Sequence, residues 1–404
     1  MGAVSHRGIA EAGLLGALRQ VRDPLLLLGV PIVFALLSIF VGYANSWPIG
    51  FDFRGTLWEP ARALLDGTPI YPEPTRASVV VGNPAVYPPL FIIASVPLAL
   101  LPVTLASWLW FCVLGVGVLV SMWILGVRDW RCHVLALTSP VVVHGLFFGN
   151  LTVLLLVPLA LAWRYRDRAR IAGLAVGMAV AAKLFVWPLV VWLLLTRRFR
   201  AAAWAVASSV VLVFGAWALI GFQGMTDYPA LLREVQDVYA IRSLSLGTVA
   251  GALGASVDVA VAVCLLAGLA LLAFAAWLAR RKDGDRRAFA VVVAACVIAS
   301  PIVWPNYAAL LLVPIAITWR RLAPAWFFGY AAWVVGAVAP KPSVSDVCCK
   351  PAGVPEQAWA WSHTEPVIWY AAGTTVVVAA VAVAIAVVVP RGRATSGSPA
   401  AARR

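Results

Sequence analysis

Residues 150–200 read NLTVLLLVPLALAWRYRDRARIAGLAVGMAVAAKLFVWPLVVWLLLTRRFR. This stretch holds three short apolar runs separated by charge: 150–163, 171–183 and 184–196. The second and third runs each form about 20 Å of helix at about 1.5 Å per residue, less than the roughly 30 Å hydrocarbon core of a bilayer. Short apolar helices of this kind, shielded by longer ones, are where membrane proteins build sites. The stretch therefore predicts a helical membrane protein with a site among short helices.

The composition of the whole chain agrees with a membrane protein. Of 404 residues, 63% are hydrophobic and 12% are charged, whereas soluble domains have about 45–50% apolar and about 25% charged residues. These values exclude a soluble globular enzyme and a disordered chain. Nine more runs are long enough, or nearly so, to cross a bilayer: 25–44, 105–127, 133–147, 202–221, 257–279, 288–303, 306–319, 325–339 and 367–389. We predict an all-α polytopic protein with about 12 transmembrane helices.

The net charge of +14 is explained by its distribution along the chain. With a cytoplasmic N-terminus and twelve crossings, 23 of the 31 Lys and Arg residues fall on the inner side, together with 6 of the 17 acidic residues. The inner side then carries +17 and the outer side −3. This bias is the positive-inside pattern of cytoplasmic loops, so it predicts no nucleic-acid partner. It also predicts a multi-pass protein of the plasma (inner) membrane with both termini cytoplasmic.

The apolar run 88–102 is broken by four prolines. A full crossing there would place the basic clusters 164–170 and 280–287 outside. We therefore expect a re-entrant or juxtamembrane element on the outer face, where irregular backbone is tolerated if protein or a wet cavity surrounds it.

Asp52 is the first candidate site residue, in the first predicted outer loop. It is flanked by Phe51 and Phe53, and partial desolvation raises the pKa of a carboxylate and makes it a better base. The alternative is that Asp52 only caps the short helix predicted from Leu57 to Leu65. Both interpretations stay open at this level.

Lys183 is the sharpest single signal, because an ionisable side chain at membrane depth costs at least about 2.5–3.5 kcal/mol and usually has a partner or a function. It either snorkels to the outer interface or neutralises an anionic group such as a lipid phosphate. The Ser300–Tyr307 segment, broken by two prolines, adds the side-chain donors Asn306 and Tyr307 beside helix ends that favour anions. For Gly149-Asn150 the local pattern favours a tight hairpin turn.

These features occur in an order that resembles glycosyltransferase family 87. The motifs, in chain order, are Asp52 after the first run, Ala61-Arg-Ala-Leu-Leu-Asp-Gly-Thr-Pro-Ile-Tyr71, Tyr87-Pro-Pro-Leu-Phe91, Gly149-Asn150, Lys183 with Pro188, Arg197-Arg198-Phe199-Arg200, and Ser300-Pro-Ile-Val-Trp304. The resemblance covers roughly residues 25–320. It implies a GT-C-like fold with its active site at the extracytoplasmic face, and it implies that Asp52 is the catalytic base.

The resemblance further implies mannose transfer from a polyprenyl-phosphate mannose donor to a glycolipid acceptor, such as phosphatidylinositol mannoside, at the bilayer. Lys183, Asn306 and Tyr307 would bind the donor phosphate. The remaining candidates for the substrate pocket are Arg54, Arg62, Tyr71, Tyr87, Asn150 and Trp304. We expect no cofactor and no metal, because the first outer loop has no paired carboxylates. The chain would be one integral membrane domain, 1–389, with its catalytic module at about 25–221, further spans over 257–389, and a disordered basic cytoplasmic tail, 390–404.

Two alternatives stay open. A lipid-linked sugar transporter or flippase would need polar residues along a path to the inner face, whereas the polar candidates concentrate on the outer half. A GT-C arabinosyltransferase would share the same motifs and differ only in the sugar that it transfers.

Overall fold

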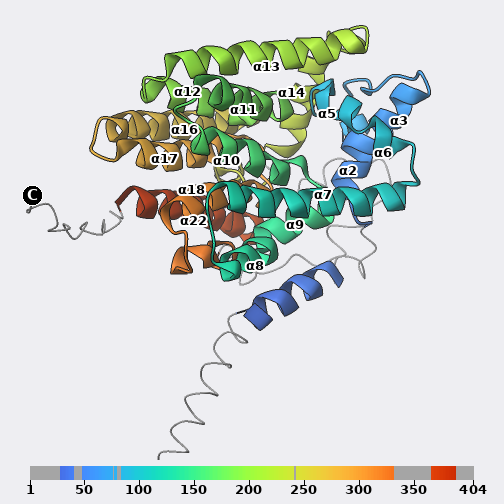
Figure 1. Ribbon diagram of the computed structural model, residues 1–404. Coiled ribbons are helices and arrows are strands. Elements are labelled where there is room, and N and C mark those ends of the chain that lie inside the picture. The colour runs from blue at the N-terminus through green and yellow to red at the C-terminus, as the bar shows by residue number, and fades with distance from the viewer. Residues whose placement is uncertain are drawn as a thin grey trace, which may run out of the picture.

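The computed structural model describes residues 28–40, 48–75, 77–79, 83–240, 243–331 and 365–387, and throughout these ranges the regular secondary structure is helical (Figure 1). Three helices are long and apolar enough to cross a membrane: α7 (Val103–Ile124), α13 (Phe199–Leu219) and α16 (Val257–Ala279). Their exposed faces carry Leu, Val, Phe and Trp side chains, as expected for helices that face lipid. The all-helical membrane fold is therefore confirmed.

The other apolar runs form shorter pieces, so the predicted count of about 12 spans stays a prediction. The run 133–147 is a bent pair, α8 (Trp130–Thr138) and α9 (Pro140–Phe148), with a 57° angle between them. Pro140 starts α9, where its missing N–H is tolerated, and it prevents α8 from continuing. The runs around residues 150–196 and 306–319 form helices of 10–17 residues.

The bounds of these shorter elements are η2 (Leu151–Leu155), α10 (Leu156–Arg164), α11 (Ala169–Ala182), η3 (Leu184–Val186), α12 (Pro188–Leu195), η4 (Pro305–Leu311) and α18 (Leu312–Thr318). The remaining helices are Leu28–Phe40, α2 (Phe51–Phe53), η1 (Arg54–Trp58), α3 (Glu59–Leu65), α5 (Pro89–Ala94), α6 (Val96–Ala99), α14 (Tyr228–Tyr239), α15 (Leu246–Ala252), α17 (Gly284–Ile298), η5 (Pro324–Phe327) and α22 (Glu365–Val387). The predicted tail 390–404 and most of the run 325–339 lie outside the described residues.

The element predicted at 88–102 consists of the short helices α5 and α6, neither of which can cross a bilayer by its length. They pack against η1, α3 and α13. Figure 1 shows α2, α3, α5 and α6 gathered at one end of the molecule. This short-helix end is where Asp52 lies.

The middle of the fold is held by close helix packing around α11 and α17. A Cβ added at Gly173 or Gly177 of α11 would collide with Trp204 or Ser208 of α13, so these glycines allow the two helices to approach closely, as small residues do in membranes. Every residue of α17 from Ala288 to Ile298 is buried. The short helices around the site are therefore enclosed by longer ones.

Several basic turns lie at the end of the molecule opposite to α2 (Figure 1). Arg166 Nε and Arg198 Nη2 contact Asp285 Oδ2 at 3.1 and 2.8 Å, and Arg198 Nη2 also contacts Asp167 Oδ1 at 2.9 Å. Trp192 Nε1 donates to Asp285 Oδ1 at 3.0 Å. We call these five residues the Asp285 cluster. It joins three segments whose charges were assigned to the same side of the membrane, and it lies at the end of the α16–α17 hairpin that is distant from α2 in Figure 1.

Candidate active site

The site begins where two glycine turns pack together. Gly50 and Gly149 have φ angles of +74° and +71°, which only glycine adopts readily. The Gly50 N–H donates to the Phe147 carbonyl at 2.7 Å, and Trp110 Nε1 donates to the Gly149 carbonyl at 2.8 Å. A Cβ on Gly149 would lie 2.8 Å from Phe53 Cβ and 3.1 Å from Gly50 Cα. The turn before Asp52 is thereby locked against the turn before Asn150.

This contact brings the Asp52 carboxylate to Asn150. Asn150 Nδ2 donates to Asp52 Oδ2 at 2.7 Å, and Asp52 lies inside α2, while the N-caps of α2, η1 and α3 are Gly50, Phe53 and Trp58. Capping therefore does not explain Asp52. Desolvation by burial raises the pKa of Asp52, while the Asn150 hydrogen bond and the Lys183 charge oppose that rise. Asp52 as a whole residue is partly buried.

Lys183 is buried, with 6% of its surface exposed. Its Nζ donates to Thr152 Oγ1 at 2.7 Å, to Asn150 Oδ1 at 3.2 Å and to the Tyr307 hydroxyl at 3.2 Å. An ammonium has three N–H donors, so all three are engaged. Snorkelling is thus not what Lys183 does, because its head group points into the protein. We call Asp52, Asn150, Thr152, Lys183 and Tyr307 the Asp52–Lys183 network.

The orientation of the Asn150 amide follows from chemistry. Its oxygen accepts from Lys183 Nζ and from the Thr152 backbone N–H, at 3.2 and 3.0 Å, and both partners can only donate. The amide nitrogen must therefore face Asp52, whose Oδ2 must accept. Asn150 therefore holds the Asp52 carboxylate in a fixed position relative to Lys183. Its side-chain oxygen also caps η2, because it accepts from the Thr152 backbone N–H. The φ of Asn150 is −77°, whereas the φ of Gly149 in the same turn is +71°.

Aromatic rings surround the lysine. Lys183 Nζ lies 4.4, 5.1 and 5.8 Å from the ring centroids of Tyr307, Tyr87 and Phe185. The Tyr307 and Phe185 rings stack at 4.6 Å. Faces of aromatic rings attract a cation, and more strongly where water is excluded. They help to keep a charged lysine in a buried place. Burial and the nearby Asp52 charge raise the pKa of Tyr87, so its phenol stays protonated.

The other predicted site residues lie outside this network. The Tyr71 hydroxyl donates to the Tyr87 carbonyl at 2.8 Å, so Tyr71 holds the backbone of a residue whose ring lies beside Lys183. Arg54 Nε donates to the Ile49 carbonyl at 2.9 Å and to Ser107 Oγ at 3.2 Å. Each of the remaining three has a different neighbour: Arg62 pairs with Asp66 on α3, Trp304 meets the Tyr239 ring, and fully buried Asn306 packs against Gly145.

Two members of the site were missed by the sequence analysis. Thr152 accepts the shortest of the three Lys183 bonds, and Phe185 forms part of the aromatic wall. The signal for Thr152 was available, because an Asn followed two residues later by Thr at a helix start is an N-cap pattern. Phe185 had no signal among so many aromatic residues.

The described part of the chain holds no group of three or more His, Cys, Asp or Glu side chains that could bind a metal ion. Metal independence remains a prediction. The arrangement offers a carboxylate that is hydrogen-bonded to an amide, in a network with a buried lysine. A carboxylate of this kind can take a proton from a hydroxyl group, and the cation can compensate negative charge that develops nearby.

Comparison with known proteins places the chain in a family. The profile of glycosyltransferase family 87 matches residues 85–301, more than half of the sequence, so the chain belongs to this family and is a membrane glycosyltransferase. A relative is the polyprenol-phosphate-mannose-dependent alpha-(1-2)-phosphatidylinositol pentamannoside mannosyltransferase of Mycobacterium tuberculosis (strain CDC 1551 / Oshkosh). It is 27% identical over 359 residues, which cover 83% of this chain and 75% of the relative. No solved structure matches significantly.

Proposed function

We propose that this glycosyltransferase moves mannose from a polyprenyl-phosphate donor to a lipid-linked glycan acceptor, such as a phosphatidylinositol mannoside. Family membership supports sugar transfer, and the name of the mycobacterial relative supports the donor and the acceptor class. The observation that carries the proposal is the hydrogen bond between Asn150 and the Asp52 carboxylate, at 2.7 Å, in a network with buried Lys183. The GT-C-like architecture is part of this proposal.

Asp52 acts as the base in an inverting transfer. The acceptor hydroxyl gives its proton to the carboxylate as its oxygen attacks the anomeric carbon of the donor sugar. The bond from that carbon to the phosphate oxygen breaks, and the phosphate leaves with the electron pair. Because Asn150 already occupies Oδ2 of Asp52, the other oxygen is the one that takes the proton. Burial favours proton uptake by raising the pKa of this group.

The leaving phosphate would meet Lys183 and Tyr307. All three Lys183 donors are engaged, so it must exchange a partner to hold a phosphate. The bond to the Tyr307 hydroxyl, at 3.2 Å, is longer than the bond to Thr152, and an ionised phosphate oxygen is a stronger acceptor than a phenol. Phosphate therefore replaces Tyr307 as acceptor, and the Tyr307 O–H, which the bond from Lys183 does not use, donates to the same phosphate. Asn306 packs against Gly145 and is not among the hydrogen-bond partners of Lys183.

The charge distribution supports an active site on the extracytoplasmic face. Asp52 and the short helices lie at one end of the molecule, and the Asp285 cluster with the α16–α17 turn lies at the other (Figure 1). The positive-inside bias assigns the latter end to the cytoplasm. A cysteine placed at Ala77 in a variant without the native cysteines should react with an impermeant reagent from outside the cell, and one at Arg168 should not.

The decisive test is transfer by the purified full-length protein. Polyprenyl-phosphate mannose and a phosphatidylinositol mannoside acceptor should give a product that is one mannose longer, both with and without a metal chelator. Polyprenyl-phosphate arabinofuranose should give none. A product only from the arabinose donor would establish the arabinosyltransferase alternative. Movement of the donor across reconstituted vesicles with no product would establish the transporter alternative.

A further inference from the structure

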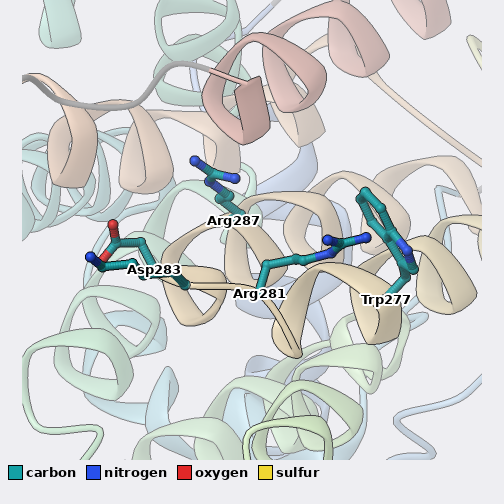
Figure 2. A pocket seen from close by; sticks show the side chains of 5 residues that line it. Trp277, Arg281, Asp283 and Arg287 are labelled. Carbon is teal, nitrogen blue, oxygen red and sulfur yellow. The ribbon is translucent and has the colours of Figure 1, made fainter.

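A basic hollow lies at the turn between α16 and α17, remote from the Asp52–Lys183 network. Its volume is about 520 Å³, and Trp277, Arg281, Lys282, Asp283 and Arg287 line it (Figure 2). Three of the five side chains are cationic and one is anionic, so the hollow has a net positive charge. We call it the hairpin pocket.

The cations of the hairpin pocket have few acceptors. Arg281, Lys282 and Arg287 form no ion pair with any carboxylate that the structure describes. Nearby Asp285 cannot serve them, because Arg166, Arg198 and Trp192 occupy both of its oxygens. Arg287 Nε is buried and has no hydrogen-bond partner among the described residues. A buried N–H without an acceptor is unfavourable, so this end of the hairpin is built to receive an anion.

The Arg281 guanidinium lies over the Trp277 ring, in an orientation that suits anion binding. Its Cζ lies 4.4 Å from the centroid of the Trp277 ring, and Figure 2 shows the side chain extended toward that ring. Stacking on an aromatic face orients a guanidinium and leaves its N–H edge available for a phosphate. Arg281 and Lys282 are both exposed to the surroundings.

An apolar strip leads along α16 to this pocket. Leu266, Leu269 and Trp277 expose 64%, 54% and 49% of their surfaces, and the small side chains Ala262, Ala270 and Ala273 are exposed too. These positions follow helical spacing, so they form one face of a membrane-crossing helix. Hydrocarbon chains fit this strip, and Trp277 marks the depth of the head groups.

We propose that the hairpin pocket binds an anionic phospholipid, with the phosphate on the exposed side chains of Arg281 and Lys282 beside Arg287, and an acyl chain along Leu269 and Leu266. Basic pockets beside membrane helices commonly hold anionic head groups. The pocket lies at the opposite end of the molecule from Asp52 (Figure 1), so this lipid is separate from the donor and the acceptor of the transfer reaction.

The test is native mass spectrometry of the full-length protein in a neutral detergent, without donor or acceptor. Phosphatidylglycerol should remain bound and phosphatidylcholine should bind at least about tenfold more weakly, since each surface cation adds appreciably to anionic-lipid affinity. Glycerophosphoglycerol, which has the same phosphodiester head group but no acyl chains, should not bind at equal concentration. Equal binding of phosphatidylcholine would overturn the proposal, and so would equal binding of glycerophosphoglycerol, which would show a site for soluble anions.

The matched variants are Arg281→Gln/Lys282→Gln and, as a control, Arg128→Gln/Arg200→Gln. Both pairs are exposed, and both remove two charges. The first should weaken phosphatidylglycerol binding about tenfold, and the control should change it less than twofold. Trp277→Leu, which keeps an apolar side chain but removes the ring, should weaken binding about threefold through loss of the Arg281 platform. Equal losses in both double variants would show a nonspecific charge effect and refute the pocket.

Discussion

Two polar clusters, one at each end of this molecule, hold their charges differently. In the Asp285 cluster, arginines meet the carboxylate directly at 2.8–3.1 Å, and the Asp285 side chain is 30% exposed. In the Asp52–Lys183 network, the amide of Asn150 stands between the carboxylate and the buried ammonium. The first arrangement satisfies opposite charges, and the second keeps them apart.

The difference teaches what each cluster is for. Direct pairing lowers the reactivity of a carboxylate, because its oxygens are filled and its charge is neutralised. The Asp52 carboxylate is joined to its cation through an amide, has one oxygen without a hydrogen bond from the described residues, and has a raised pKa, and these properties suit a base. We therefore propose a structural role for the Asp285 cluster and a catalytic role for the Asp52–Lys183 network, and the following variants test that division.

Asp52→Asn should have the largest effect. Loss of the base should lower kcat by about 10²–10⁴-fold. Thermal stability should hold or rise, because a carboxyl with a raised pKa in the folded state loses stability as pH increases through that pKa, and asparagine has no such penalty. Asp66→Asn on the exposed surface of α3 is the control. Full activity of Asp52→Asn would remove Asp52 from the mechanism.

Lys183→Met should lower kcat by about 10²–10³-fold, the usual effect of losing one group that stabilises developing charge. Because the lysine charge lowers the pKa of Asp52, the acid limb of the profile of kcat/KM against pH should also move to higher pH. Arg200→Met at the opposite end should leave the profile in place. An unmoved acid limb with only a raised donor KM would mean that Lys183 acts on the phosphate alone.

Asn150→Ser should separate the two roles of Asn150, which are to position Asp52 relative to Lys183 and to cap η2. Serine also caps helices well, yet it is too short to join Asp52 to Lys183, so kcat should fall about tenfold while stability is kept. Asn150→Ala should show the same kinetic loss and a further destabilisation of about 1 kcal/mol. Steady-state rates and thermal unfolding measure the two effects. Wild-type rates in Asn150→Ser would show that the amide does not position the base.

Asp285→Asn should have the smallest effect on the reaction. Two arginines lose a charged partner, which should lower the free energy of unfolding by about 1–2 kcal/mol after allowance for solvent exposure. Turnover at 25 °C should be unchanged. Asp283→Asn, whose carboxylate forms no ion pair with the described residues, should change neither quantity. Reduced turnover with unchanged thermal unfolding would refute the structural assignment.

Much of the candidate site was predictable from residue chemistry. Asp52, Lys183, Asn150 and Tyr307 were all singled out, because a charge or an amide in an apolar chain is conspicuous and needs a partner. The partners themselves were not predictable. Asn306 and Tyr307 are adjacent and chemically alike as donors, yet only Tyr307 faces the lysine, since the helical path of η4 turns the two side chains to different sides.

The sequence by itself determined the class of the protein, an all-helical membrane protein, and which basic turns gather at one end. Composition and charge bias decide these properties residue by residue, without long-range contacts. Only the tertiary structure decided that Asp52 meets Asn150, 98 positions later, and that Lys183 meets Tyr307, 124 positions later. Those meetings depend on the positive φ of Gly50 and Gly149 and on close packing around them, which hydropathy does not encode.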